Sequence, residues 1–155
     1  MIRRKLKIWD KIPNGVCDEL LEKYKTLKDD YYWVCFFDTH DEMYNYYDKK
    51  FGLVDPTSHN YDGLCKYSSN WYSDDTWDKN CGYILFLNDK LTFETMAHEL
   101  AHALTFYFDN RIMYCERIFS SDYMEYNELF CYLTGFINQK VAMIVNSLPN
   151  KKESE

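Results

Sequence analysis

The residues with the clearest capacity for chemistry form one short run, His98-Glu99-Leu100-Ala101-His102. Side chains four residues apart on a helix lie on the same face, so both imidazoles could reach one ion. Imidazole nitrogens bind zinc at about 2.0–2.1 Å. Glu99 would lie about 100° round the helix from His98, beside the metal, where a carboxylate can take a proton from a water on the ion. The run therefore predicts a zinc site with an adjacent general base.

The residues around this run favour a helix with two distinct faces. Thr92 can cap a helix that begins at Phe93. Its apolar stripe would comprise Phe93, Ala97, Leu100 and Leu104, whereas His98, His102 and Thr105 share another face. Two alternatives stay open at this point. The histidines could be structural, hydrogen-bonded groups, or the run could be accidental and bind no metal.

A catalytic zinc usually has three protein ligands and one open position, so a further ligand must follow His102. Metzincin peptidases carry Gly and His three and six residues after the second histidine, where this chain has Thr105 and Phe108. Asp109 would lie about 10 Å farther along a continuous helix, too far to share the ion. The remaining acidic candidates are Glu116, Asp122, Glu125 and Glu128. Glu128, in the first turn of a predicted helix, is best placed, although a carboxylate there also favours the helix dipole.

These segments resemble parts of a known family. Residues 95–103 (TMAHELAHA) look like the active-site helix of zincin metallopeptidases, and Asn127-Glu128 is similar to the segment of gluzincins that supplies a glutamate ligand. Together they resemble small zinc peptidases encoded by phages and prophages, with Tyr132-Leu133 as the matching Tyr-Leu pair. The resemblance covers about residues 83–137. It implies a metallopeptidase with one Zn²⁺ ion, in which His98, His102 and Glu128 are the ligands and Glu99 is the catalytic base.

One position departs from the gluzincin pattern. Thermolysin-like members have Asp four residues after the ligand Glu, as the partner of the first histidine, whereas this chain has Tyr132. We therefore expect Tyr132 or a backbone carbonyl to orient His98. A donor for the oxyanion is also needed. The eligible side chains are Tyr107, Tyr123, Tyr126, Tyr132 and Arg111.

Composition narrows the class of protein. The chain has 155 residues, of which 46% are apolar and 28% charged, as expected for one globular domain (1–148) followed by a disordered tail (149–155). The net charge of −7 disfavours nucleic-acid binding. No run of about 18 apolar residues exists to cross a membrane, and Asp10 and Lys11 interrupt any signal-peptide core. We therefore expect a cytoplasmic protein, with its six cysteines reduced and mostly buried. The resemblance to phage and prophage peptidases implies a bacterial or phage-infected cell.

Periodicity and turn residues predict an α+β domain. We expect a minimal zincin-like domain, in which a short, mostly antiparallel sheet packs on the HExxH helix and on a long C-terminal helix. Helices are predicted over 14–28, 41–51, 93–108 and 126–147, and strands over 32–37, near 64–67, near Trp71 and over 82–87. The strand 82–87 (GYILFL) is interpreted as an edge strand along which an extended peptide could pair. Gly135 is interpreted as a point of close approach between helices.

Two functions fit these observations. The first is a zinc metallopeptidase, acting on a peptide or protein substrate. The second is a zinc-stapled binding module without catalysis, for example a phage counter-defence protein that acts by protein contact. The small size, the acidic charge and the 15 tyrosines are compatible with a module that binds a basic partner surface. Changing Glu99 to Gln distinguishes them, because only the peptidase depends on that carboxylate. The oligomeric state is not indicated.

Overall fold

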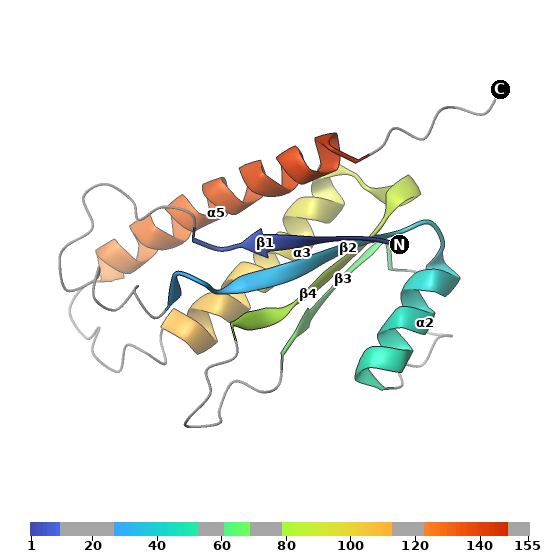
Figure 1. The fold of residues 1–155 in the computed structure, drawn as a ribbon. Coiled ribbons are helices and arrows are strands. Elements are labelled where there is room, and N and C mark those ends of the chain that lie inside the picture. Colours follow the sequence, from blue (N-terminus) through green and yellow to red (C-terminus); the bar gives the residue numbers. More distant parts are fainter. Residues whose placement is uncertain (10–26, 53–60, 69–78, 113–122, 149–155) are drawn as a thin grey trace.

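A computed structural model describes residues 1–9, 27–52, 61–68, 79–112 and 123–148, with side chains except at 111–112 and 123–129 (Figure 1). The fold is α+β, as predicted. Its strands are β1 (Ile2–Lys7), β2 (Tyr31–Phe37), β3 (Gly63–Tyr67) and β4 (Asn80–Leu87), and its helices are α2 (His40–Phe51), α3 (Phe93–Tyr107) and α5 (Tyr123–Asn146). Two short helical segments, η1 (Asn88–Lys90) and η2 (Phe108–Ile112), flank α3. None of the described helices is both long enough and apolar enough to cross a membrane.

The four strands form one mixed sheet in the order β1-β2-β4-β3. β1 pairs with β2 and β3 pairs with β4 in antiparallel fashion, whereas β2 and β4 run parallel. Two of the three pairings are therefore antiparallel, in line with the predicted sheet. β1 and β3 are the edge strands, and β2 and β4 are central.

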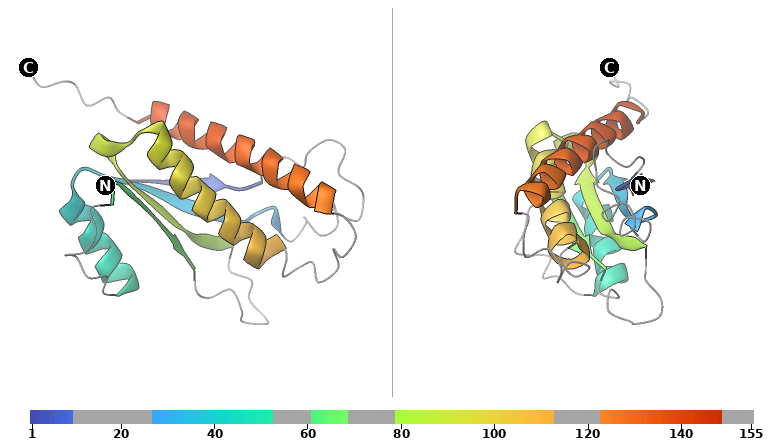
Figure 2. Two further views of the ribbon diagram at one scale, coloured as in Figure 1. Left: turned by 180° about the vertical axis from the view of Figure 1, so that it is seen from behind. Right: turned by 90° about the vertical axis from the view of Figure 1, so that its left-hand side faces the viewer.

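Different helices cover the two faces of the sheet (Figure 2). Alternate residues of the strands, including Val34, Phe36, Ile84 and Phe86, pack in one core with α3 and α5. The intervening residues, including Cys35, Phe37, Leu85 and Leu87, pack with Met43 of α2. Because both faces of the central strands are buried, β2 and β4 have nearly continuous apolar sequences.

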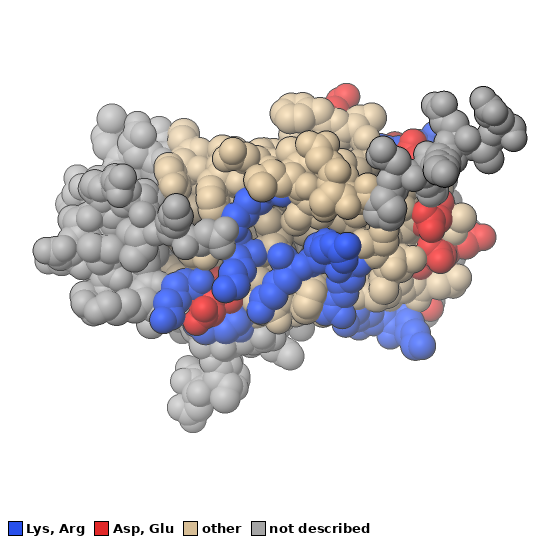
Figure 3. Space-filling model, turned by 45° about the horizontal axis from the view of Figure 1, so that its top comes forward, with Lys and Arg blue, Asp and Glu red and all other residues tan. Residues whose placement is uncertain are grey.

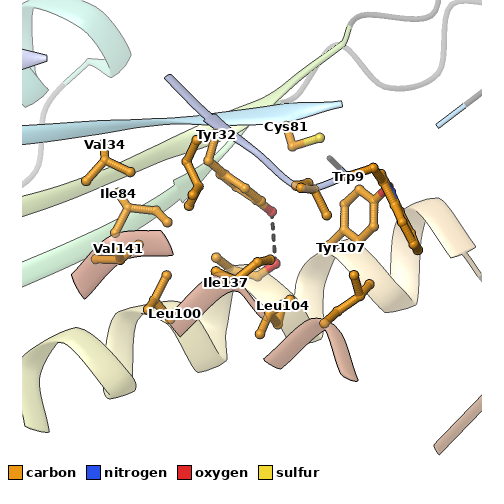
Figure 4. Close-up of a cluster of buried hydrophobic side chains, with 14 of the residues drawn as sticks. Trp9, Tyr32, Val34, Cys81, Ile84, Leu100, Leu104, Tyr107, Ile137 and Val141 are labelled. Atoms are coloured by element: carbon orange, nitrogen blue, oxygen red, sulfur yellow. Dashed lines mark hydrogen bonds between the residues drawn. The ribbon is translucent and has the colours of Figure 1, made fainter. Parts of the chain in front are cut away.

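Buried polar contacts also fix α3 to the sheet (Figure 4). The Tyr32 hydroxyl donates to the carbonyl of Ala103 at 2.9 Å. At the end of α3, the Tyr107 hydroxyl accepts from Trp9 Nε1 at 2.7 Å and donates to the fully buried Asp30 carboxylate at 3.2 Å. Burial raises the pKa of Tyr32 and of Tyr107 well above the usual value, so both phenols stay protonated as donors.

Most predicted elements within the described ranges are confirmed. Those over 32–37, 41–51, 64–67, 82–87, 93–108 and 126–147 correspond to β2, α2, β3, β4, α3 and α5. The predicted helix 14–28 falls almost wholly outside the described residues, as do the strand near Trp71 and the tail 149–155. The first strand, β1, was not predicted, because its sequence IRRKLK is mostly charged.

Two predictions about packing are wrong. The strand GYILFL lies within β4, which is paired on both sides by β2 and β3 and so is not an edge strand. Its strongly apolar sequence reflects a central position. Gly135 is exposed, and a Cβ built there meets no atom within 4 Å, so this glycine does not permit a close helix contact.

Gly135→Ala should raise the free energy of unfolding by about 1 kcal/mol, because glycine in a helix interior has excess backbone freedom and here nothing obstructs a methyl group. Urea unfolding followed by circular dichroism measures the change. Gly52→Ala is the matched control. Gly52 has equal space but a φ of +79°, so alanine there should be destabilising. A loss of stability in Gly135→Ala would contradict the assignment of an unobstructed helical site.

Candidate functional site

The helix α3 carries the histidine run and begins where the sequence predicts. Thr92 caps it, since its hydroxyl accepts from the Thr95 backbone N–H at 3.1 Å. Leu100 and Leu104 are buried as expected, but Phe93 is 74% exposed and does not join the apolar stripe. As the first helical residue, Phe93 lies at the helix end and away from the core. The rest of the stripe turns the histidines outward.

His98 and His102 face each other on the exposed side of α3. Their Nε2 atoms lie 3.1 Å apart, and their rings are inclined at 80° with centroids separated by 4.7 Å. Two nitrogens that bind one ion tetrahedrally at about 2.05 Å are about 3.3 Å apart. The observed spacing is close to that value, so the pair fits two ligands of a single zinc ion.

Glu99 lies beside the histidine pair but is buried, with 7% of its surface exposed. Its carboxylate accepts a hydrogen bond from the backbone N–H of Cys65 in β3. Burial raises the pKa of Glu99, while His98, His102 and the Cys65 N–H oppose that rise. The result is a fixed carboxylate with increased affinity for a proton, next to two imidazoles.

The edge strand β3 forms the wall against which this part of α3 packs. Gly63, Cys65 and Tyr67 lie on the same side of β3, because side chains alternate along a strand. A Cβ at Gly63 would lie 2.8 Å from Glu99 Cγ, and the Tyr67 ring stacks on Phe106 of α3 at 3.4 Å. Sequence analysis did not find Gly63 or Cys65, because no local pattern connects them with a residue more than 30 positions later.

The outer edge of β3, which is the side that does not pair with β4, runs along α3. Asp62 and Ser68, next to the ends of β3, bond to Leu87 and Cys81 on the β4 side. By the antiparallel alternation, the backbone groups of Gly63, Cys65 and Tyr67 then face away from β4. The Cys65 N–H already donates to Glu99.

The third ligand cannot be placed in the same way. Glu128 belongs to α5, which packs against α3, but its side chain is outside the described set. The side chain of Glu125 is also outside the described set, and Glu116 and Asp122 lie outside the described residues altogether. Asp109 lies beyond His102 in η2, where the helical chain continues, so it stays excluded. Among the described side chains, no three His, Cys, Asp or Glu residues form a group that could hold a metal.

The candidate oxyanion donors separate clearly. Tyr107 is excluded because its hydroxyl is buried between Trp9 and Asp30. Tyr132 is 44% exposed and stacks on Phe136 of the same helix, and no contact with His98 is found. The side chains of Arg111, Tyr123 and Tyr126 are outside the described set. Tyr67, not considered from sequence, has its pKa raised by burial and then by Cys65 and Glu99, and therefore remains a protonated donor near the site.

Known proteins provide no template for this arrangement. No protein-family model matches the chain, and neither does any curated protein or solved structure. The roles of His98, Glu99 and His102 must therefore be inferred from their own geometry.

Gly63→Ala should lower the free energy of unfolding by about 1–3 kcal/mol, because the new methyl group overlaps Glu99 Cγ and lies 3.3 Å from the Leu85 carbonyl oxygen. The loss should be smaller in a Glu99→Ala background, where that Cγ is absent. A double-mutant cycle measured by urea unfolding gives the coupling, which we expect to exceed about 0.5 kcal/mol.

The control for this cycle is Glu94→Ala, which removes an exposed carboxylate from the first turn of the same helix. Gly63→Ala should cost as much in that background as in the unmodified chain. Equal costs in the Glu94→Ala and Glu99→Ala backgrounds would show that Gly63 and Glu99 are not in contact.

Proposed function

We propose that this chain is a zinc-dependent metallopeptidase that hydrolyses peptide bonds with Glu99 as the general base. The observation that carries the proposal is the 3.1 Å separation of the His98 and His102 Nε2 atoms, with a buried, hydrogen-bonded carboxylate between the pair and the sheet edge. A purely structural histidine pair would not need an adjacent carboxylate that is costly to bury.

His98 and His102 would hold the metal through Nε2, and Glu128 would complete the site through its carboxylate. The chemistry of this donor set, two imidazoles and a carboxylate, is that of catalytic zinc sites with one open position. Bound zinc supplies a Lewis acid that lowers the pKa of a water molecule to about 7 and polarises a carbonyl group.

Glu99 moves the proton. Its carboxylate accepts the proton of the attacking water and then delivers it to the nitrogen of the leaving amine. The Cys65 N–H orients the carboxylate, and burial raises its pKa above the usual value, which increases its affinity for the proton of the water. Gly63 leaves the space that this carboxylate needs.

The substrate would pair as an extended strand with the outer edge of β3. The strand GYILFL cannot take this role, because β4 is paired on both sides. β3 packs beside α3, and the outward backbone groups of Gly63 and Tyr67, with the Cys65 carbonyl, can bond a peptide. The stacked Tyr67 and Phe106 rings, next to His102 along α3, would form the wall of a pocket for an apolar substrate side chain.

The setting we propose is the cytoplasm of a bacterial or phage-infected cell. Cys35 is a buried free thiol, Cys65 is half-buried and free, and Cys131 is an exposed free thiol. Free thiols, and above all an exposed one, are typical of a reducing compartment. Burial is confirmed for Cys35 and Cys81 but not for Cys131, and the reduced state of the cysteines stays a prediction.

Glu99→Gln should reduce hydrolysis of an unstructured protein such as casein by about 10²- to 10⁴-fold, because the amide cannot accept the proton. Bound zinc should stay at one equivalent, because Glu99 is not a ligand. Activity is measured by release of fluorescent peptides and zinc by inductively coupled plasma mass spectrometry. Retained cleavage would remove Glu99 from its role.

His98→Ala and His102→Ala serve as the matched controls, since both should lose zinc together with activity. If Glu99→Gln keeps its biological effect while both histidine variants lose it, the chain is a zinc-stapled binding module and not a peptidase.

Loss of a residue that only hydrogen-bonds to a ligand weakens metal binding by about 10- to 100-fold. Glu128→Ala should weaken zinc binding by more than this, because it removes a direct ligand. Glu125→Ala is the control, an equal loss of charge three residues away on the same helix. Competition with a chromophoric chelator measures both affinities. Similar affinities in the two variants would mean that another residue is the third ligand.

A further inference from the structure

The opposite edge of the sheet carries a second surface with a different chemistry. A groove of about 530 Å³ runs between β1 and α5. It lies away from β3, the edge strand that packs beside Glu99. Its lining residues are Lys5, Leu6, Lys7, Phe136, Gln139, Lys140, Met143 and Ile144. This volume is within the range of about 300–1,000 Å³ that is typical of ligand sites.

The groove is apolar at its base and basic at its rim. Leu6 is buried, Phe136 and Ile144 are partly buried against the core, and Met143 is 65% exposed. Among the described residues that line the groove, three are lysines and none is acidic, although the chain as a whole has a net charge of −7. Figure 3 shows the lysines and arginines gathered on this side of the molecule. The local charge is therefore opposite to that of the whole protein.

Contacts with neighbouring groups hold two of the lysine ammonium groups in position. Lys5 Nζ lies 3.8 Å from the centre of the Tyr31 ring, and Lys140 Nζ lies 4.6 Å from that of Phe136. Lys140 Nζ also donates to the Lys7 carbonyl oxygen at 3.2 Å. Less side-chain entropy is lost when such positioned charges bind an anionic group.

β1 offers backbone groups along this groove. Ile8, just after β1, donates to Asp30 on the β2 side, so by antiparallel alternation the backbone groups of Lys5 and Lys7 face away from β2. No described strand pairs with that side of β1. Because the Lys7 carbonyl already accepts from Lys140, an extended chain that adds to β1 there would bond to the Lys5 backbone groups and the Lys7 N–H. It would place alternate side chains over the apolar base.

We propose that this groove binds an extended, acidic segment of a partner protein, which adds to β1 as a further strand. Its carboxylates meet Lys5 and Lys7 on one face of the added strand. Its alternate apolar side chains cover Leu6 and Met143 on the other face, beside Lys140. A nucleic acid fits less well. Phe136, the one aromatic ring among the described lining residues, already has Lys140 above it, and the acidic remainder of the chain repels a long polyanion.

The test uses the full chain and a fluorescein-labelled peptide, (Glu-Val)₄, whose period of two puts acidic and apolar side chains on opposite faces. Fluorescence anisotropy should show saturable binding with a Kd below about 1 mM. The peptide (Lys-Val)₄ and the oligonucleotide (dT)₁₂ should bind at least about tenfold more weakly. No saturation with (Glu-Val)₄, or tighter binding of (dT)₁₂, would overturn the proposal.

Variants locate the binding. Lys5→Glu combined with Lys140→Glu should weaken (Glu-Val)₄ binding at least about tenfold, and Met143→Glu, at a well-exposed position, should also weaken it. The control Lys66→Glu makes the charge change of a single lysine substitution on β3, at the other edge of the sheet, and is compared with Lys5→Glu alone. If Lys66→Glu weakened peptide binding equally, the loss of binding would be due to net charge alone. That result would contradict a site at β1. His98→Ala should bind the peptide normally, so this result is independent of the peptidase proposal.

Discussion

The arrangement of the candidate site depends on one buried carboxylate held between an edge strand and a helix. The Cys65 N–H of β3 donates to the Glu99 carboxylate, which is almost removed from solvent. Burying a carboxylate is unfavourable unless a donor satisfies it, and here the raised pKa of Glu99 records that cost. Side chains with such shifted pKa values concentrate at functional sites, because chemistry needs groups that folding alone would not select.

This hydrogen bond is useful only because the rest of α3 is fixed. The helix is attached to the sheet by Tyr32 at Ala103 and by the Trp9–Tyr107–Asp30 network at its end. These contacts are buried and polar, so they specify both the rotation and the position of the helix. The histidine face is consequently held outward while Glu99 is held inward, although the residues are neighbours in sequence. A site built on a rigid helix in this way is organised before any ligand binds.

The sequence predicts what depends on local pattern. The helical spacing of Leu133, Ile137 and Val141 gives α5, the cap at Thr92 gives the start of α3, and the HExxH run gives the paired imidazoles. It does not predict what depends on pairing between distant segments. β1 is mostly charged because its exposed residues face solvent, and the central position of β4 follows from neighbours that a single strand cannot reveal. The contact of Gly63 with Glu99 is hidden for the same reason.

The two edges of the sheet are flanked by residues of different chemistry. Lysines on an edge strand are a common way to prevent unwanted pairing, and β1 has them. Protection alone, however, does not require an apolar base, and α5 places Phe136, Ile144 and the exposed Met143 beside those lysines. At β3 the neighbouring helix instead places a carboxylate and two imidazoles next to the outer edge. The two proposals therefore assign a different kind of extended chain to each edge, because the helix beside an edge decides which side chains can be accommodated.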